Sequence, residues 1–564
     1  MSGVGRAGSA GSDERCVVGV DLGTLSGRVV VVRVADGAVL GSAVHEYAHG
    51  VVEGEWRGRR LAPGWALQVP EDYLEVLRTA VPAALRVAGV RPEAVVGIGC
   101  DATSCTVLPT DATGTPLCAL PEYADRPHAY AKLWKHHAAQ GRADRITALA
   151  EARGETWLAA YGGRISAEGQ YAKALELFEE DRPLYDTMRH WVEVSDWVVW
   201  QLGGAYVRNA SAAGYKGIGP EGVSPSAEFL EALAPGFASF VPDKLAHPVA
   251  QLGTRAGRLT AQAAAWTGLP EGIAVATGNV DAHVTAAGVG AVEPGRLALI
   301  TGTSTCHITS ADVRREIPGV CGVVEGGVVA GRFGYEAGQS GSGDILAWFA
   351  RTGVPAAYVE AAAAAGESVH EHLTRLAGGL EVGATGLVAL DWHSGNRSVL
   401  MDHELSGLVV GLTLATRPEE VYRALLEATA FGTRVVVEAL EGGGVPVREV
   451  FVAGGLTGNP LLLQILADVL RRPLSVVRVE HAGALGSAVH AAVAAGAYAD
   501  VPTAARSMAA DRVDVLVPDE ARAQAYDALF AVYTELYDGF GRESDVMRRL
   551  AAVRRAALRS PTPG

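Results

Sequence analysis

The sequence is poor in lysine, and no lysine follows a glycine. The five lysines are Lys132, Lys135, Lys173, Lys216 and Lys244. A Walker A loop needs a Gly-Lys dipeptide, so this absence excludes the P-loop class of nucleotide-binding proteins. A GxGxxG pattern does occur at residues 3–8, but no strand precedes it, and we interpret it as accidental.

Cysteine is also scarce, and long apolar runs are missing. The six cysteines form no C-x-x-C pair, which favours reduced, buried thiols in a cytoplasmic protein. No stretch reaches the roughly 18 consecutive apolar residues of a membrane span, and the N-terminal segment lacks a signal-peptide core. The net charge of −15 argues against nucleic-acid binding. We therefore expect neither a membrane nor a nucleic acid as a partner.

The length of 564 residues exceeds what one hydrophobic core usually supports. Strands and helices alternate along the chain, which predicts an α/β protein with two domains. We expect a first domain over residues 15–277 and a second over residues 278–550, with tails at 1–14 and 551–564. Residues 253–268 predict a helical crossover near the boundary.

Residues 16–41 predict a strand, a tight turn and a second strand, followed by an Asp-Gly hairpin signal. In the turn, Gly23 lets backbone N–H groups approach an anion, while Thr24 and Ser26 add hydroxyl donors. A Walker or Rossmann loop would continue into a helix, but here the β-branched residues 29–32 predict a strand. The pattern therefore indicates a hairpin that can hold a phosphate group.

Asp21 stands at the end of the first strand, beside this turn. A carboxylate at this place can hold Mg²⁺ through water, because Mg²⁺ dehydrates reluctantly. The alternative is an aspartate that only caps the turn. We expect Asp21 to belong to a Mg²⁺ site.

The second half of the chain offers further nucleotide-binding candidates. Residues 296–308 repeat the plan of strand, turn and strand, with Gly302 and Thr303 as donors, although a Gly/Thr turn alone is weak evidence. Gly454 and Gly455 follow an apolar strand and leave bare backbone against which adenosine can lie. Asn459 then stands where a helix begins, and the alternative for it is a plain helix cap.

Asp281, in the segment Gly-Asn-Val-Asp-Ala-His at 278–283, is the strongest catalytic candidate. A sugar hydroxyl that attacks a γ-phosphate needs a carboxylate to accept its proton. Asp281 follows an apolar strand near the expected boundary between the halves, where a cleft would lie. The alternative is an aspartate that caps a helix.

Two further charged residues stand in glycine-flanked segments. Lys216 lies between Tyr215 and a glycine, and its retention in an arginine-rich chain suggests a site that needs a compact charge. Glu336 offers one carboxylate in a similar setting. The adjacent His136 and His137 suggest a metal site at first sight, but neighbouring side chains point apart on a helix and no third ligand has suitable spacing.

With these residues assembled, the chain resembles the FGGY family of carbohydrate kinases from Cys16 to about Leu550. The segments that carry the resemblance are GIGCDATSCT (97–106), HAYAKLWKHHAAQ (128–140), YGGRISAE (161–168), DWVVWQL (196–202), AGYKG (213–217), GNVDAHV (278–284), GTSTCH (302–307), GYEAGQS (334–340), LDWHSGNRSVL (390–400) and GLTLATRPEEVYRALLEATAFGTR (411–434).

The resemblance implies two actin-like (ribonuclease H-like) domains with ATP and sugar in the cleft between them. It implies transfer of the γ-phosphate of ATP to the 5-hydroxyl of L-ribulose, in the presence of Mg²⁺, as a step in arabinose breakdown. It allows a homodimer without requiring one. Carried over to this sequence, the catalytic base is Asp281, and the sugar is bound by Ser104, Lys216, Asp281 and Glu336. The implied nucleotide, phosphate and Mg²⁺ residues are Asp21, Gly23, Thr24, Ser26, Arg28, Gly302, Thr303, Gly454, Gly455 and Asn459.

Some positions depart from the family pattern and leave the sugar open. Gly169, Gln170 and Tyr171 stand where relatives usually have a tryptophan, and residues 340–343 are unusually rich in glycine and serine. The alternative substrates are D-ribulose, ribitol and xylulose. An ATP-gated chaperone or a sugar sensor built on the same fold is the non-enzyme alternative.

Overall fold

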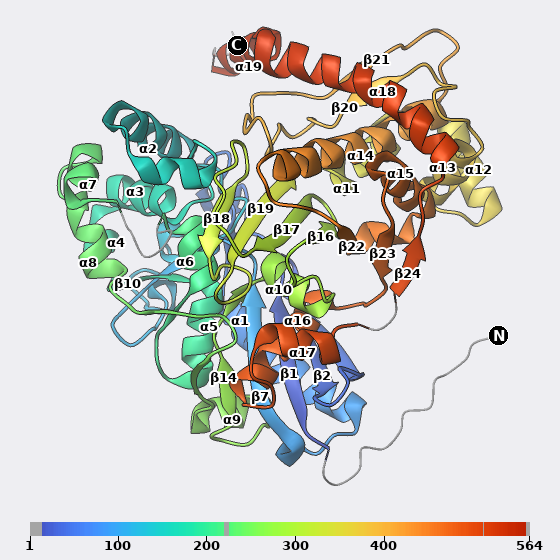
Figure 1. Ribbon diagram of the computed structural model, residues 1–564. Coiled ribbons are helices and arrows are strands. Elements are labelled where there is room, and N and C mark those ends of the chain that lie inside the picture. Colours follow the sequence, from blue (N-terminus) through green and yellow to red (C-terminus); the bar gives the residue numbers. More distant parts are fainter. Residues whose placement is uncertain (1–13, 219–224, 511–512, 560–564) are drawn as a thin grey trace.

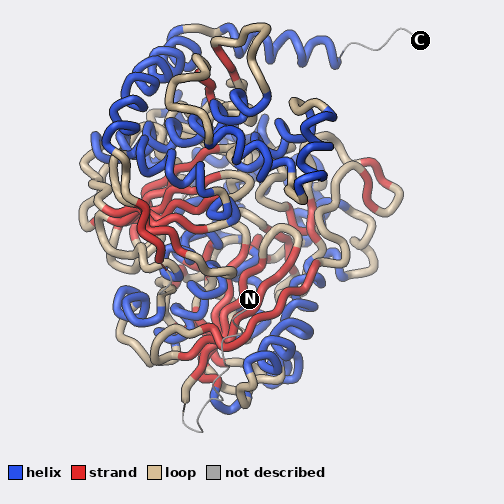
Figure 2. The backbone as a smooth tube through the Cα atoms, turned by 90° about the vertical axis from the view of Figure 1, so that its right-hand side faces the viewer, coloured by secondary structure: helices blue, strands red, loops and turns tan. Residues whose placement is uncertain are grey.

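The computed structural model describes residues 14–218, 225–510 and 513–559 of the chain. Two lobes are stacked one above the other, each built around a sheet with helices on its faces (Figures 1 and 2). The tail expected at 1–14 falls outside the described residues apart from Glu14, and so do residues 560–564 of the tail expected at the other end.

The first lobe contains a 7-stranded sheet in the order β13-β14-β7-β1-β2-β3, with β15 also paired to β7. The first three strands form an antiparallel meander, and β7 then pairs in parallel with β1. Almost every residue of β1 is buried, which explains its nearly continuous apolar sequence. The strands are β1 Cys16–Leu22, β2 Ser26–Arg33, β3 Val39–Glu46, β7 Val95–Ala102, β13 Arg255–Arg258, β14 Ala274–Ala276 and β15 Asn279–Val280.

The second lobe repeats this plan in a 7-stranded sheet of order β18-β19-β17-β16-β22-β23-β24. Here β16 pairs antiparallel with β17 and parallel with β22, as β1 does with β2 and β7. The repeat confirms the expected pair of actin-like domains. The strands are β16 Arg296–Thr301, β17 Thr305–Ala311, β18 Gly322–Glu325, β19 Phe333–Gln339, β22 Glu449–Ala453, β23 Leu474–Val477 and β24 Val513–Leu516.

A layer of helices covers each lobe. In the first lobe α1 packs on β2 and β3, while α5 packs on β7, β13 and β14. In the second lobe the long helix α14 packs against α13, α15 and the strand β20. The helices of the first half are α1 Pro70–Ala88, α2 Gln140–Arg153, α3 Gln170–Glu180, α4 Arg182–Thr187, α5 Val194–Gly203, α6 Ala210–Lys216, α7 Ala227–Leu233, α8 Phe240–Lys244, α9 Ala261–Thr267 and α10 Asp281–Gly288.

The remaining elements complete the lobes. A 4-stranded sheet has the order β10-β8-β9-β6, and its strand β10 packs against α5 and α8. The other strands are β4 Glu55–Trp56, β5 Arg59–Arg60, β6 Leu67–Gln68, β8 Val107–Thr110, β9 Ala131–Lys132, β10 His190–Glu193, β11 Arg208–Asn209, β12 Val249–Ala250, β20 Val388–Leu390 and β21 Leu408–Val410. The other helices are α11 Gly343–Thr352, α12 Ala356–Ala365, α13 Val369–Gly378, α14 Pro418–Gly442, α15 Pro460–Leu470, α16 Ala482–Ala494, α17 Val501–Met508, α18 Glu520–Asp538 and α19 Val546–Arg559.

The helix α16 comes late in the chain but packs on β1, β7 and the helix α10 of the first lobe (Figure 1). The approach is close because glycines face it. A Cβ atom on Gly19 would lie 1.8 Å from the carbonyl oxygen of Ala484, and one on Gly99 would lie 2.2 Å from that of Ser487. The chain therefore returns to its first sheet after building most of the second, so a boundary at 277/278 does not separate the lobes completely.

Two segments differ from expectation. The predicted helical crossover at 253–268 begins instead with the strand β13, which pairs with β14, and only α9 is helical. At the other end, α19 continues to Arg559, through residues expected to form a tail, and ion pairs with the body of the protein hold it. Among the described helices, none combines the length and apolar character that crossing a bilayer requires.

Candidate active site

A cavity of about 480 Å³, the central cavity, lies between the two lobes. Both predicted phosphate turns open onto it, one from the β1–β2 hairpin and one from the β16–β17 hairpin, and the first turn of α10 stands between them. The predicted site residues that line it are Asp21, Gly23, Thr24, Arg28, Ser104, Asp281, Gly302, Thr303 and Glu336. Residues from distant parts of the sequence thus meet at one place.

Side chains from outside the hairpin hold the β1–β2 turn. The indole N–H of Trp134 donates to the hydroxyl oxygen of Thr24 at 3.1 Å, and the amide of Gln68 donates to the Thr24 carbonyl at 2.7 Å. The Thr24 hydroxyl therefore keeps its own proton free to donate to an anion in the cavity. Ser26, by contrast, is buried in β2 and does not line the cavity, although its hydroxyl was expected to face phosphate.

Asp281 begins α10, and its Oδ1 accepts a hydrogen bond from the backbone N–H of Ala282 at 2.7 Å. Burial and the nearby charge of Asp21 raise the pKa of the Asp281 carboxyl to about 7, although the Ala282 hydrogen bond and Arg28 oppose the shift. Arg28 also forms an ion pair with Asp21, with Nη1 3.5 Å from Oδ2. The carboxyl of Asp281 is thus poised to gain or lose a proton near neutral pH.

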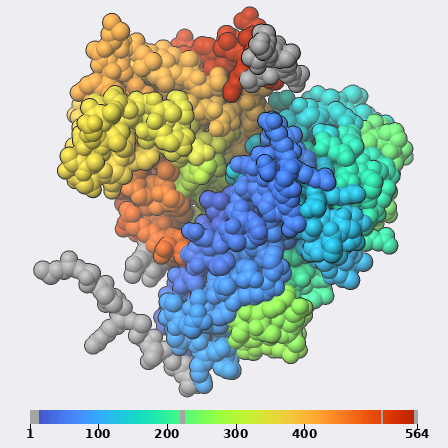
Figure 3. All heavy atoms as spheres, turned by 180° about the vertical axis from the view of Figure 1, so that it is seen from behind, coloured from blue at the N-terminus to red at the C-terminus, as the bar shows by residue number. Residues whose placement is uncertain are grey.

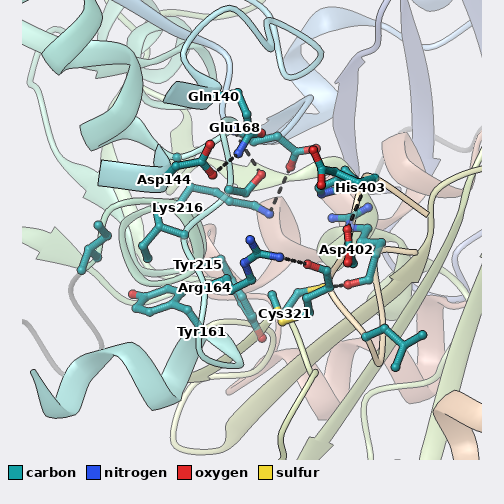
Figure 4. Close-up of a pocket in the computed structure, with 18 of the residues that line it drawn as sticks. Gln140, Asp144, Tyr161, Arg164, Glu168, Tyr215, Lys216, Cys321, Asp402 and His403 are labelled. Carbon is teal, nitrogen blue, oxygen red and sulfur yellow. Dashed lines mark hydrogen bonds and ion pairs between the residues drawn. The ribbon is translucent and has the colours of Figure 1, made fainter. Parts of the chain in front are cut away.

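A second cavity, the side cavity, has a volume of about 790 Å³ and adjoins the central cavity, because Glu168 and Arg397 line both. Lys216 lies in it with its Nζ 3.6 Å from Glu168 and 3.4 Å from Glu336. Figure 4 shows Lys216 and Glu168 facing one another, with Asp402 and His403 to their right in this view. Arg397 also donates to Glu336. Two cations and two carboxylates therefore meet where the cavities join.

These charges stabilise one another in a buried place. Burial disfavours ionisation of Glu336, but Lys216 and Arg397 hold its pKa well below the usual range. Burial likewise opposes the charge of Lys216, and Glu336 keeps its pKa above the ordinary value. For Glu168, Arg397 and Lys216 outweigh burial and lower the pKa to about 2. All three groups are charged at neutral pH, which suits binding of a polyhydroxylated molecule through charged hydrogen bonds.

His283 connects the segment 278–284 to the segment 334–340. Its Nε2 lies 3.2 Å from Oε2 of Glu336, its Nδ1 lies 2.6 Å from the hydroxyl of Ser211, and its ring packs against Tyr215. Glu336 is therefore fixed from three sides, by Lys216, Arg397 and His283.

A third cavity, the second-lobe cavity, has a volume of about 690 Å³ and opens beside the loop that follows β22. Gly455 and Asn459 line it, together with Leu346, Thr374 and Tyr422. Gly454 supports the loop in a conformation with φ of 101°. The Asn459 side chain caps α15 by accepting from Leu462 N at 3.0 Å, and its amide donates to Thr374 at 3.2 Å. Asn459 therefore forms the helix cap that we expected as the alternative, and it also lines the second-lobe cavity.

The sequence interpretation assigned no role to Glu168, Arg397, His283 or Trp134, although all lie in the segments that carry the family resemblance. Glu168, like Lys216 and Glu336, stands in a segment that contains a neighbouring glycine, whereas Arg397 lies between Asn396 and Ser398 and is one of many arginines. His136, considered for a metal site, instead lies 2.8 Å from Glu176, which also accepts from Lys132 at 2.7 Å.

The two departures from the family pattern lie at these cavities. Gly169 lines the side cavity and precedes α3, whose first residues Gln170 and Tyr171 are buried. Residues 340–343 lead into α11, and the backbone N–H of Gly343 donates to Gly302 in the second phosphate turn at 2.9 Å. The first departure therefore bears on the side cavity and the second on the phosphate turn.

Comparison with known families gives two matches that together span most of the chain. Residues 16–288 match the N-terminal domain of the FGGY family of carbohydrate kinases, and residues 297–495 match the C-terminal domain of that family.

Similar proteins extend these matches over the full length. A ribulokinase from Mycolicibacterium smegmatis is 58% identical over 97% of this chain and 98% of its own length. One from Geobacillus thermodenitrificans is 48% identical over 95% of this chain and 97% of its own. Among solved structures, the xylulose kinase from Rhodospirillum rubrum superposes with a TM-score of 0.74 and 26% identity, covering 93% of this chain and 99% of that one.

Proposed function

The chain belongs to the FGGY family of carbohydrate kinases and is an ATP-dependent sugar kinase; from this premise we propose that its substrate is L-ribulose, phosphorylated on the 5-hydroxyl. The observation that carries the choice of sugar is identity of 58% and 48%, over nearly the whole chain, to two ribulokinases. The charged group of Lys216, Glu168 and Glu336 supports it, because such groups recognise the hydroxyls and carbonyl of a ketopentose.

In the proposed reaction, the two phosphate turns hold the triphosphate from opposite sides and Asp281 serves as the base. Its carboxylate accepts the proton of the 5-hydroxyl while the oxygen attacks the γ-phosphorus and the bond to the β-phosphate oxygen breaks, releasing ADP. Phosphoryl transfer needs little covalent help, so placement and charge compensation supply most of the rate. The hydroxyl of Thr24 and the guanidinium of Arg28 face the cavity in which that charge develops.

The residues of the central cavity fit a Mg²⁺ ion. Asp21 and Asp281 line the same cavity, and the charge of Asp21 disfavours ionisation of Asp281, so a cation between substrate and protein relieves the repulsion. Mg²⁺ keeps several waters and needs only one or two carboxylates beside the substrate phosphates. We propose that Asp21 holds it through water. When bound, the ion would neutralise charge on the β- and γ-phosphates.

The test is a panel of L-ribulose, D-ribulose, ribitol and xylulose under identical conditions, with ADP release measured and the phosphorylated carbon identified by NMR. We expect the highest kcat/KM for L-ribulose and a product carrying phosphate on carbon 5. A clearly higher kcat/KM for another sugar would replace the proposed substrate. ADP release independent of any sugar would point to the sensor alternative.

A further inference from the structure

Residues 396–402 form a closed loop beside the side cavity. Asn396 and Asp402 pair through both backbone hydrogen bonds, at 2.8 and 2.9 Å, and the Asn396 side chain accepts from Leu400 N at 2.9 Å. Both end residues are buried. Between them the loop supplies Arg397, which donates to Glu336, and Met401, which lines the side cavity. Its position therefore decides where the Arg397 guanidinium meets the substrate-binding carboxylates.

The C-terminal helix α19 holds this loop. Nε of Arg548 donates to Oδ2 of Asp402 at 2.7 Å, and its two Nη atoms donate to the carbonyls of Gly541 and Ser544 at 2.9 and 3.3 Å. The other carboxylate oxygen of Asp402 accepts from Glu404 N at 2.9 Å. A single arginine thus joins the closing residue of the loop to the turn between α18 and α19.

The loop also reaches the first lobe. Nη1 of Arg164 donates to the carbonyl of Met401 at 3.0 Å, and Gly162 lies so close that a Cβ atom there would be 2.5 Å from the Met401 sulfur. Figure 4 shows Arg164 and Asp402 at the same cavity. The loop therefore forms a wall of the side cavity that both lobes contact, and α19 continues that wall, because Arg548 and Arg555 also line the cavity.

We propose that Arg548 is a positioning residue for the sugar: through Asp402 it fixes the 396–402 loop, and thereby the Arg397 guanidinium, against Glu336 in the sugar-binding cavity. This proposal rests on the proposed function for the identity of the sugar. The proposal gives α19 a role in sugar binding, although this helix contains neither a phosphate turn nor the catalytic aspartate. Among the described interactions Arg548 contacts neither Glu336 nor Lys216, although it lines the side cavity as Asp402 does. The double variant described below therefore separates positioning through Asp402 from a direct contact with the sugar.

The experiment compares Arg548→Ala with the wild-type protein in steady-state kinetics on the best sugar of the panel. The Arg548→Ala variant loses the ion pair with Asp402 and the hydrogen bonds to Gly541 and Ser544. We expect its KM for the sugar to rise about tenfold, and its KM for ATP to stay within about twofold of the wild-type value. Asp402→Asn should have a similar effect without removing volume. The double variant should be little worse than either single one, because both changes break the same link. Arg548→Lys, which keeps the charge, should recover part of the affinity.

The matched control is Arg549→Ala, which removes the next arginine of α19, whose partner is the exposed Asp545 at 3.0 Å. It should leave both KM values unchanged. An unaltered sugar KM in Arg548→Ala and Asp402→Asn would overturn the proposal, and so would equal losses in the sugar KM, the ATP KM and kcat. If Arg548→Ala does not fold, Asp402→Asn alone decides. Failure of the wild type on L-ribulose would reject the proposed substrate, while the comparison of variants remains valid on whichever sugar is accepted.

Discussion

Lys216 of α6 and Glu336 of β19 come from opposite lobes and meet with Nζ 3.4 Å from Oε1, both nearly buried. The pair spans the junction of the central and side cavities. A sugar that binds there gains charged hydrogen bonds to both lobes at once, so sugar binding and the relative position of the lobes are coupled.

Replacing Lys216 by alanine should weaken sugar binding. The change removes a charged donor from the side cavity while Arg397 still neutralises Glu336, so we expect the sugar KM to rise about tenfold or more, with the ATP KM nearly unchanged. Steady-state kinetics with each substrate varied in turn gives the sugar KM and the ATP KM separately. Lys135→Ala, which removes a partly exposed lysine paired with Glu53, is the control. A change confined to the ATP KM would assign Lys216 to the other ligand.

Asp281→Asn should remove the base and keep the shape of the side chain. We expect kcat to fall by about 10²–10⁴-fold, the range for loss of a positioned base. The sugar KM should change much less, because the amide still accepts the Ala282 hydrogen bond. A coupled ADP assay with saturating ATP and sugar gives kcat directly. Turnover near the wild-type rate would show that another group takes the proton.

The pH dependence of kcat/KM should report the ionisation of Asp281. Burial and Asp21 raise the pKa of its carboxyl to about 7 in the free protein, and only the ionised form can accept a proton. Activity is therefore present above this pKa and is lost as the pH falls through it, by about tenfold between pH 8 and pH 6. The residual activity of Asp281→Asn should lack this acid limb. An acid limb that persists unchanged in the variant would belong to another group.

Gly454→Ala should destabilise the second lobe at the loop after β22. Gly454 has φ of 101°, and a Cβ atom there would lie 2.2 Å from the carbonyl oxygen of Thr301, so both backbone strain and a clash oppose alanine. We expect a loss of about 2 kcal/mol or more, seen as a lower melting temperature. A Cβ atom at Gly458, in the same loop, would have no neighbouring atom within 4 Å, so the Gly458→Ala variant should have the melting temperature of the wild type. Equal melting temperatures would show that the loop adjusts.

Local sequence signals predicted the parts of the site that depend on the backbone. The hairpin at Gly23 and Thr24 and the turn at Gly302 were recognisable because a phosphate turn needs glycine and hydroxyl residues in order, flanked by β-branched strands. The start of a helix near Asp281 was foreseen as the alternative to a catalytic role, and α10 does begin at this residue. A local sequence pattern does not show which distant segments pair in the fold. The contacts of Arg397 with Glu336 and of Arg548 with Asp402 were therefore not predicted.

The errors have physical causes as well. The strand β13 was taken for helix because its four residues are half-exposed at a sheet edge and show no alternation of apolar and polar side chains. Ser26 was expected to face phosphate because it was assigned to the turn, but β2 already begins at Ser26 and the residue is buried. Residues 551–559 of the arginine-rich helix α19 were taken for a tail, because the partner of Arg555, Glu404, is 151 residues away in the sequence.

A fragment that ends after α10 should fail to fold. It would contain β1, β7 and their glycines but lack α16, which covers them, so one face of the first sheet would be exposed. We expect residues 1–290 alone to aggregate or to be digested rapidly by protease. Coexpression with residues 291–564 should rescue the fragment. A soluble fragment with a cooperative melting transition would show that α16 is dispensable.

The return of α16 to β1 and β7 also orders events during synthesis. The ribosome releases the first strand early, yet the helix that seals it is made only after most of the second lobe. The nascent first lobe must therefore wait, with an apolar sheet face unsealed, until nearly all of the protein has emerged. In this architecture β1 is synthesised well before α16 but is fully covered only once α16 packs on it, so completion of the first lobe depends on synthesis of the second.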